Sequence, residues 1–528
     1  MITRTCFGTV VLLAMATAAQ ADLSISKKPT HNVSCSGGMC RATAKGANLN
    51  VNTLTNLLAA GDTTVKFGGG ALAIQVLDGF SWTSVSRLTL DANTSVGFHK
   101  PVTVAGQGAL TIAYNDGGSD GDLKFFDTGK VDFWNTSSSL IVNSNSYLLV
   151  NDITTLAAAV IANHSGNFAL ANDYDASADG TYKKSPVGHE FGGNFEGLGH
   201  TIDALTIDDP KLKTEGPFNT VGLFAHVNYP GSVRDLGLTH VSVTAAGNAL
   251  VGGISGSGNG DIRNSFVQGS ITGGTGVRAG CIAGFGGTTA NSRGACAVRV
   301  GSQGFAGGVV GSGIVTGSSA TGSVTGGSRS LVGGIAGEGM IDDCSSSVTV
   351  VGGNRSRAGG LVGMMHGHEA ITNSFATGSV SGGSGANAGG LVGHASPYHG
   401  FYPAIQNSYA MSTAHGKANS QVGGLIGYAA YGVSLQTSFS TGKVSGGFAF
   451  VGGSVGSNRG ADADFIYWDM DSNGSAQGCG EGDCAGITGL TDTQLKSALP
   501  DGFDPKIWGQ SPSINNGYPY LLANPPPQ

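Results

Sequence analysis

Glycine and aliphatic positions recur along most of the chain in one six-residue pattern, here called the glycine clip. It consists of a small residue or valine, two glycines, two mostly aliphatic residues and a final glycine. Full copies start at Val251, Ala306, Val332, Ala358, Ala388, Val422 and Val451, and weaker copies start at Val221 and Ala279. The clip returns every 26 to 34 residues, and such a period indicates one supersecondary unit stacked on itself.

The segment between two clips recurs as well. Residues 262–271, 371–380 and 435–444 share a Ser-Phe pair followed by alternating polar and aliphatic positions. In several copies nine residues separate the last Val or Ile from the next Gly-Gly pair, as from Val380 to Gly389. We therefore expect two or three short strands per repeat, stacked in register, with Gly-Gly supplying either positive φ or close backbone approach.

Short alternating runs and two helical patterns lie outside the repeats. Residues 88–90, 102–104, 110–112, 131–133 and 140–142 each place two apolar side chains on one face of a predicted strand. Residues 153–163 have apolar positions at helical spacing and predict one short helix. Thr491 to Gln494 form a capping-box pattern before a second helical segment, as expected at an atypical solenoid end.

These elements predict an all-β chain built as a parallel β-solenoid, with a short helix near 153–163 and an atypical C-terminal cap. We expect a signal peptide at 1–21, N-terminal solenoid coils at 22–150, a helix-containing segment at 151–220, the repeats at 221–460, and the C-terminal cap and tail at 461–528. The signal is indicated by Arg4, a short apolar stretch and Ala19-Gln20-Ala21 before Asp22.

Composition narrows the classes of partner. Of 528 residues, 91 are Gly, and Lys and Arg together number only 27 in a chain of net charge −7. No basic stripe is visible, which argues against nucleic acid as a partner. After the signal, no apolar run reaches the roughly 18 residues of a membrane span. We therefore expect an exported protein without an integral membrane segment.

Cysteine spacing predicts local disulfides. Cys35 with Cys40, and Cys479 with Cys484, each enclose four residues, and an oxidising compartment would close both loops. Metal binding is the alternative, but no His accompanies either pair. Cys281, Cys296 and Cys344 remain, and either two of them pair across coils or all three pack as small buried side chains.

Several of these motifs resemble a known family. Gly-Gly-Leu-Val-Gly at 359–363 and 389–393, together with Ile371-Thr-Asn-Ser-Phe-Ala-Thr-Gly, resemble the GLUG-motif repeats of bacterial surface and secreted proteins. That group is often placed with filamentous-haemagglutinin-like adhesins. Residues 165–173 and 195–202 resemble the segment preceding such repeats, and Tyr467-Trp-Asp and Gly517-Tyr-Pro-Tyr-Leu match the usual ending. The resemblance implies a right-handed parallel β-helix and a role in surface adhesion.

The sequence predicts no catalytic, cofactor-binding or metal-binding residues. Enzymes on β-helices need carboxylates on adjacent coils, but acidic residues such as Glu338 and Glu369 stand almost alone in the repeats. His366-Gly-His368 would place two rings on one face of a strand, yet no third ligand is evident. Residues 469–474 begin like an EF-hand loop, but Gly480 occupies the twelfth position, so a structural turn is preferred.

An insertion in the repeats indicates a functional site more clearly than these candidate catalytic or metal-binding residues do. The clip spacing stretches to 34 between Ala388 and Val422, where Ser396-Pro-Tyr-His-Gly-Phe-Tyr-Pro403 enters. Insertions in repeat proteins protrude from one face and often carry the binding surface. Tyr398, Phe401 and Tyr402 would form an aromatic platform for sugar rings or a protein partner, with cover of a coil edge as the alternative.

The sequence thus predicts an exported, adhesin-like, non-catalytic solenoid without cofactors that binds an extracellular glycan or protein surface. We expect it outside the cell or at the cell surface, with the periplasm as the alternative. A polysaccharide lyase or hydrolase on the same fold is the runner-up, and it requires three or more charged groups gathered on neighbouring coils. A purely structural envelope protein is the third hypothesis.

Overall fold

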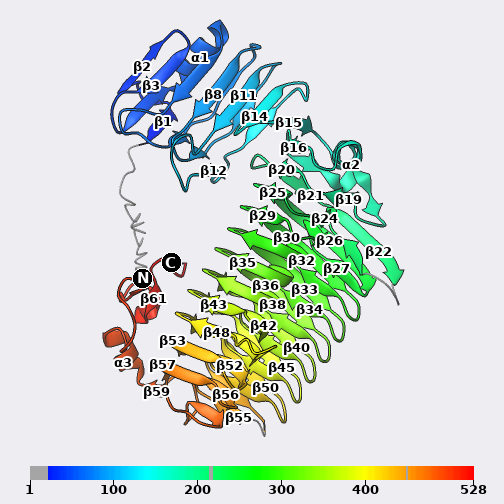
Figure 1. Cartoon of the computed structure of the whole chain (residues 1–528), viewed down its shortest axis with the longest axis vertical. Coiled ribbons are helices and arrows are strands. Elements are labelled where there is room, and N and C mark those ends of the chain that lie inside the picture. Colours follow the sequence, from blue (N-terminus) through cyan, green and yellow to red (C-terminus); the bar gives the residue numbers. More distant parts are fainter. Residues whose placement is uncertain (1–21, 213–217, 448–449, 528) are drawn as a thin grey trace, which may run out of the picture. The chain divides into compact units, whose positions relative to one another are not determined.

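The computed structural model describes residues 22–212, 218–447 and 450–527, so the predicted signal at 1–21 lies outside it. The chain divides into two compact units, one ending at Tyr147 and the other spanning Leu148–Gln528. In each unit parallel strands stack turn upon turn, which confirms the predicted all-β solenoid, with about 16 turns in all (Figure 1). Within the described ranges, no helix is both long and apolar enough to cross a bilayer.

The first unit contains the predicted short strands and one helix that the sequence analysis missed. The predicted runs correspond to β8 (Arg87–Asp91), β10 (Val102–Val104), β11 (Ala109–Ala113), β13 (Val131–Phe133) and β14 (Ser139–Val142). The unpredicted helix is α1 (Val51–Ala60), and it is capped by the preceding Asn50, whose side chain accepts hydrogen bonds from two backbone amides. Its Leu54 and Leu58 are fully buried, so this helix covers the interior of the first turns.

The second unit opens with the predicted helix, α2 (Ile153–Ala162), and continues as stacked columns of parallel strands (Figure 1), three of which are described here. One column is a nine-stranded sheet of β23 (Asn219–Val221), β27 (Ala249–Val251), β31 (Arg278–Gly280), β34 (Phe305–Gly307), β37 (Leu331–Gly333), β41 (Arg357–Gly359), β46 (Asn387–Gly389), β51 (Gln421–Gly423) and β55 (Phe450–Gly452). Each of these strands enters a glycine clip or its weaker copy.

The strands that leave the clips form the second column, and the segments between clips form the third. The second column is β24 (Phe224–Val227), β28 (Ser255–Ser257), β32 (Ala283–Ala290), β35 (Val310–Thr316), β38 (Ala336–Asp342), β42 (Val362–His366), β47 (Val392–Ser396), β52 (Ile426–Ala429) and β56 (Val455–Asn458). The third is β26 (Gly237–Gly247), β30 (Phe266–Gly273), β33 (Arg293–Val300), β36 (Ser319–Gly326), β40 (Thr349–Gly352), β45 (Ser379–Gly382), β50 (Thr413–Gly416) and β54 (Val444–Gly446). Equivalent clip residues pair directly, as Val332 with Ala358 and Ala358 with Ala388.

The clip glycines are required by close backbone approach, and none of those in the full copies lies in the left-handed region. A Cβ atom on Gly360 would lie 2.0 Å from the carbonyl oxygen of Gly390 in the next turn. A Cβ atom on Gly363 would lie 2.4 Å from the backbone nitrogen of Val332 in the preceding turn. The clip is therefore a corner where backbone packs on backbone, both within a turn and between turns.

A buried column of small polar side chains runs through the second unit, here called the serine ladder. Its members are Ser265, Ser292, Ser318, Cys344, Ser374, Ser408 and Ser438. The amide of each member donates to the side-chain oxygen or sulfur of the next, and each side chain donates to the carbonyl two residues earlier, as Ser408 does to Gln406. The ladder thus satisfies buried amides and carbonyls at a corner that has no continuous strand pairing.

The two predicted disulfides are present, and the structure decides between the alternatives left for the other three cysteines. Disulfides join Cys35 to Cys40 and Cys479 to Cys484. Of the three remaining cysteines, Cys281 pairs with Cys296, and Cys344 is a buried free thiol that occupies a serine position in the ladder. Burial raises the pKa of the Cys344 thiol to about 12, so it stays protonated.

The C-terminal segment packs along the flank of the second unit (Figure 1). After β57 (Asp462–Asp469) and β59 (Ile487–Leu490) comes α3 (Asp492–Ser497), which begins with the predicted capping box. Phe503, Trp508 and Tyr518 of this segment cover a stack of aromatic rings from successive turns, Phe375, Tyr409 and Phe439, whose centroids lie 4.9 and 5.1 Å apart. The EF-hand-like stretch is a structural turn in which the buried Asp469 accepts hydrogen bonds from Asp471 and Ser472.

We predict that Gly360→Ala destabilises the second unit by roughly 2–3 kcal/mol, because the new methyl group must displace the backbone of the next turn. The control is Gly188→Ala, whose Cβ would meet only a carbonyl oxygen at 3.4 Å. Denaturant unfolding of both variants checks this. Equal stability of the two variants would show that the clip does not depend on close backbone approach.

The serine ladder generates a second prediction. Ser408→Ala should cost about 1–3 kcal/mol, because the buried Ser374 amide loses its acceptor. Cys344→Ser should change stability by no more than about 1 kcal/mol, because a hydroxyl can make the same two hydrogen bonds as the thiol. The free energies of unfolding of the two variants test the ladder together. A larger loss for Cys344→Ser than for Ser408→Ala would refute it.

Candidate functional site

The residue that follows the last glycine of each clip pairs with its equivalents in the neighbouring turns, and these residues stack into one column, here called the outer ladder. From the clip at Ala306 onward its members are Ser312, Glu338, Met364, His394, Tyr428 and Ser457, and Glu481 continues the column by pairing with Ser457 in the turn after the last clip. The rings of His394 and Tyr428 stack at 4.6 Å, and Asn387, just before a clip, contacts His394 at 2.9 Å. The repeated backbone geometry of the clip thus carries side chains that differ between neighbouring turns.

The corner after the outer ladder grows from turn to turn. Clip spacing is 26 residues after Val332, 30 after Ala358 and 34 after Ala388. In the first of these turns β38 runs straight through the corner, whereas the next two insert first a tight turn and then a hairpin. Successive turns therefore project further, and the step between them forms a pocket.

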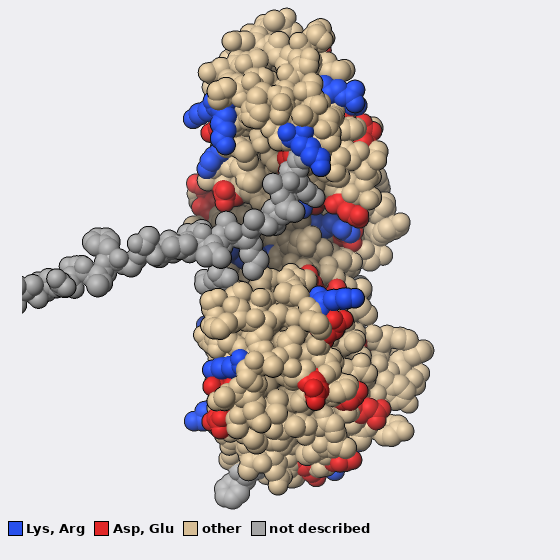
Figure 2. Space-filling view, turned by 90° about the vertical axis from the view of Figure 1, so that its left-hand side faces the viewer, with Lys and Arg blue, Asp and Glu red and all other residues tan. Residues whose placement is uncertain are grey.

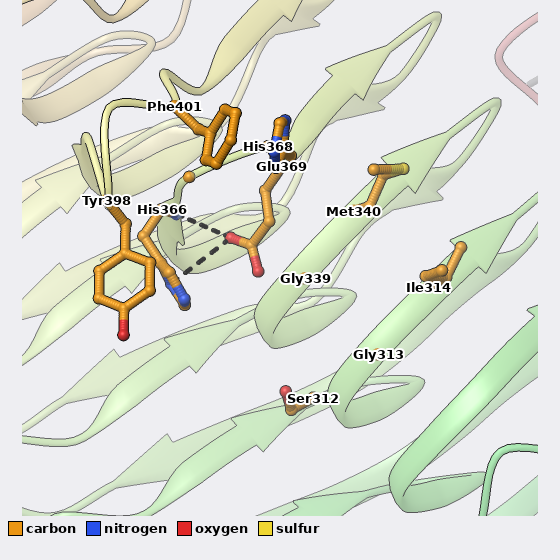
Figure 3. A pocket seen from close by; sticks show the side chains of 11 residues that line it. Ser312, Gly313, Ile314, Gly339, Met340, His366, His368, Glu369, Tyr398 and Phe401 are labelled. Atoms are coloured by element: carbon orange, nitrogen blue, oxygen red, sulfur yellow. Dashed lines mark hydrogen bonds and ion pairs between the residues drawn. The ribbon is translucent and has the colours of Figure 1, made fainter.

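The step encloses a pocket of about 330 Å³ (Figure 3). Ser312, Ile314 and Met340 lie on β35 and β38, the strands without an insertion. The other side is formed by the tight turn from His366 to Glu369, between β42 and β43 (Ala370–Thr372), and by the hairpin between β47 and β48 (Ala404–Gln406). The pocket therefore lies in the region where the clip spacing becomes irregular.

The hairpin holds two of the three predicted aromatic residues at this pocket. Tyr398 and Phe401 exchange two backbone hydrogen bonds of 3.0 Å, and His399 and Gly400 between them both have positive φ, as in a type I′ turn. The Tyr398 ring meets His366 edge-on at 5.4 Å, and the Phe401 ring lies 3.5 Å from that of His368. Both aromatic side chains remain about half exposed.

The third predicted aromatic residue, Tyr402, does not line the pocket. Its ring lies against Gly432 of the next turn, where a Cβ atom would be 2.3 Å from it. Tyr431, which the sequence analysis did not select, lies in the same way near Gly460 and is 71% exposed. The corner thus presents exposed aromatic rings on two successive turns, and their role in binding stays a prediction.

Three ionisable side chains that the sequence analysis considered separately converge beside the aromatic rings. His366 Nδ1 lies 2.9 Å from Glu338 Oε1 and 3.9 Å from Glu369 Oε2. Glu369 Oε2 also accepts a hydrogen bond of 2.8 Å from the His366 backbone amide (Figure 3). These three side chains offer nitrogen and oxygen donors that could hold a metal ion.

The electrostatics of this cluster, here called the Glu–His–Glu cluster, follow from its partial burial. Burial raises the pKa of the Glu369 carboxyl to about 8, the backbone hydrogen bond from His366 opposes the rise, and the negative charge of Glu338 adds to it. Glu338 Oε2 lies 3.9 Å from Arg278 Nη1 and 3.5 Å from Ser312 Oγ. One oxygen of Glu338 is thus oriented by neighbours, while the other faces His366.

The sequence analysis missed this cluster because its members are distant in the chain. Glu338 stands six residues after its clip start and His366 eight residues after the next one, so their proximity depends on the pairing of β38 with β42. Aligning the repeats on the clip would have placed them in neighbouring turns. His368, considered there as a second ligand, instead packs on Phe401.

Charge elsewhere is sparse. On the face drawn in Figure 2, Lys, Arg, Asp and Glu stand in small groups separated by wide uncharged areas. The positive side chains on this face do not form one continuous stripe.

Comparison with known proteins shows no family. No family model matches the chain. Halomucin of Haloquadratum walsbyi is 28% identical over 232 residues, which are 42% of this chain but only 2% of the length of Halomucin. A solved structure of a putative immunoglobulin A1 protease from Bacteroides ovatus is 18% identical, with a TM-score of 0.28 over 72% of this chain and 92% of that one. A TM-score this low carries no argument, and the GLUG resemblance stays a prediction.

Proposed function

We propose that this protein is an exported, adhesin-like β-solenoid that binds an extracellular glycan or protein surface without catalysis. The observation that carries the proposal is the pair of half-exposed rings, Tyr398 and Phe401, fixed by a hydrogen-bonded hairpin above the pocket. Exposed aromatic rings on a monomer are costly in water, and their concentration at one pocket favours a binding role.

The hairpin gives these rings the properties of a binding platform. Their positions are set before a ligand arrives, by two backbone hydrogen bonds and by contacts with His366 and His368. A preorganised aromatic ring loses little conformational entropy on binding, so more of the contact energy appears as affinity. Tyr402 of the same turn and Tyr431 of the next turn extend the aromatic surface along the solenoid, which suits an extended ligand such as a glycan chain.

Export is supported by the cysteines. Three disulfides in the described residues favour an oxidising compartment, because thiols stay reduced in the cytosol. The signal-like residues 1–21 point the same way. Surface attachment of several copies would add avidity to contacts that are individually weak, which is the usual requirement of adhesion.

An array of glycans and extracellular-matrix proteins tests the proposal. We predict that the double variant Tyr398→Ala, Phe401→Ala binds its ligand about 30-fold more weakly, which corresponds to the roughly 2 kcal/mol expected when central aromatic contacts are lost. Trp134→Ala is the matched control, because this ring is 71% exposed but lies in the first unit. Unchanged binding by the folded double variant would refute the aromatic platform.

A polysaccharide-acting enzyme is the second candidate, and one observation favours it. The Glu–His–Glu cluster gathers three ionisable groups on neighbouring turns, as that hypothesis required. Its carboxylates are engaged with Arg278, Ser312 and the backbone, which favours a fixed arrangement over proton exchange with a substrate. Release of reducing or unsaturated ends from any glycan on the array, abolished by Glu369→Gln, would establish the enzyme and contradict the non-catalytic proposal.

A further inference from the structure

The donor atoms of the Glu–His–Glu cluster have the separation that a small metal ion needs. Zn²⁺ binds nitrogen and carboxylate oxygen at about 2.0–2.2 Å in tetrahedral geometry, so its ligand atoms lie roughly 3.4 Å apart. His366 Nδ1 is 2.9 Å from Glu338 Oε1 and 3.9 Å from Glu369 Oε2, which brackets this value. All three atoms lie within 4.8 Å of one another, and this is the one such group of three in the part of the chain that the structure describes.

The Nδ1 atom of His366 is shielded from solvent and makes no hydrogen bond, although the carboxyl groups of Glu338 and Glu369 lie beside it. A buried polar atom without a hydrogen bond carries a desolvation cost that the fold must offset. Coordination of an ion between the nitrogen and the two carboxylates removes this cost. A bound divalent cation would then also face the carboxyl groups of both Glu338 and Glu369.

Neighbouring groups hold the ligands as they do in known metal sites, where ligating carboxylates are themselves hydrogen-bonded. Ser312 and Arg278 orient Glu338 through the oxygen that faces away from His366. The His366 backbone amide orients Glu369 across the tight turn. Glu338 lies on β38, His366 ends β42 and Glu369 lies in the turn after it, and because β38 pairs with β42 the backbone fixes their spacing.

We propose that Glu338, His366 and Glu369 form a binding site for a divalent transition-metal ion, with Zn²⁺ the best match. Mixed imidazole and carboxylate donors suit Zn²⁺, whereas Ca²⁺ takes six to eight oxygens and Mg²⁺ an octahedral set of oxygens. Three protein ligands leave coordination positions for water or for an oxygen of a bound molecule at the aromatic pocket. The metal site does not depend on the proposed function, because a structural ion would use the same ligands.

Calorimetric titration of ZnCl₂ into the purified protein, without a polyhistidine tag, tests this site. We expect one Zn²⁺ per chain, bound at least about 10-fold more weakly by His366→Ala and by Glu369→Gln. Glu369→Gln keeps the shape of the side chain and so serves if His366→Ala fails to fold. Glu481→Gln is the control, because Glu481 occupies the same outer ladder as Glu338 but pairs with Arg459 at 2.8 Å.

Visible absorption of the Co²⁺-loaded protein gives a second readout, since d–d bands report mixed nitrogen and oxygen ligation directly. No saturable Zn²⁺ binding, or binding that the ligand variants leave unchanged, would overturn the site. Tighter binding of Ca²⁺ than of Zn²⁺ would overturn its assignment to a transition metal. The glycan array, read with and without EDTA, tests ligand binding separately from the metal titration. Failure of the metal site therefore appears in the titration, and failure of the binding proposal appears on the array.

Discussion

The contact on which the rest of the structure depends is backbone against backbone at the glycine clip. Gly360 packs on Gly390, and Gly363 on Val332, at distances that leave no room for a side chain. Because such contacts repeat in the turns that carry the clip, they fix the register of the strands that enter and leave the corner. Each position of the outer ladder is then aligned with its equivalents in the neighbouring turns. The clip therefore positions side chains that lie outside it.

This constraint explains how a repetitive fold can carry one distinct site. The core positions and the serine ladder must repeat, since each turn satisfies the amides of its neighbour. The loop at the corner beyond the outer ladder does not have to repeat from turn to turn, because lengthening a surface loop costs little free energy. A turn of 26 residues followed by turns of 30 and 34 therefore leaves the core unchanged and produces a step, with the pocket, the aromatic hairpin and the Glu–His–Glu cluster at it.

The sequence predicted what depends on local periodicity and missed what depends on neighbouring turns. The repeat period, the short strands, the helix near 153–163, the capping box and two disulfides could all be inferred from nearby residues. Helix α1 was missed because its apolar positions stand among strand-like runs, although Val51, Leu54 and Leu58 follow helical spacing. The pairing of Cys281 with Cys296 and the convergence of Glu338 with His366 needed the register between turns, which a single repeat does not contain. The residue types of the insertion predicted three aromatic rings on one platform, but they could not predict that the Tyr402 ring lies against Gly432 of the next turn instead.

The central claim is that regular turns build the fold and the irregular corner carries the function. Replacement of Ser396–Pro403 by a copy of the four-residue turn from His366 to Glu369 gives the 34-residue turn the 30-residue length of its neighbour. Binding of this shortened protein to the ligand found on the array is the most direct measurement, with thermal unfolding as the check of folding. The account predicts a cooperatively folded protein that has lost ligand binding. A folded protein that binds as before would contradict the account, and so would a protein that no longer folds.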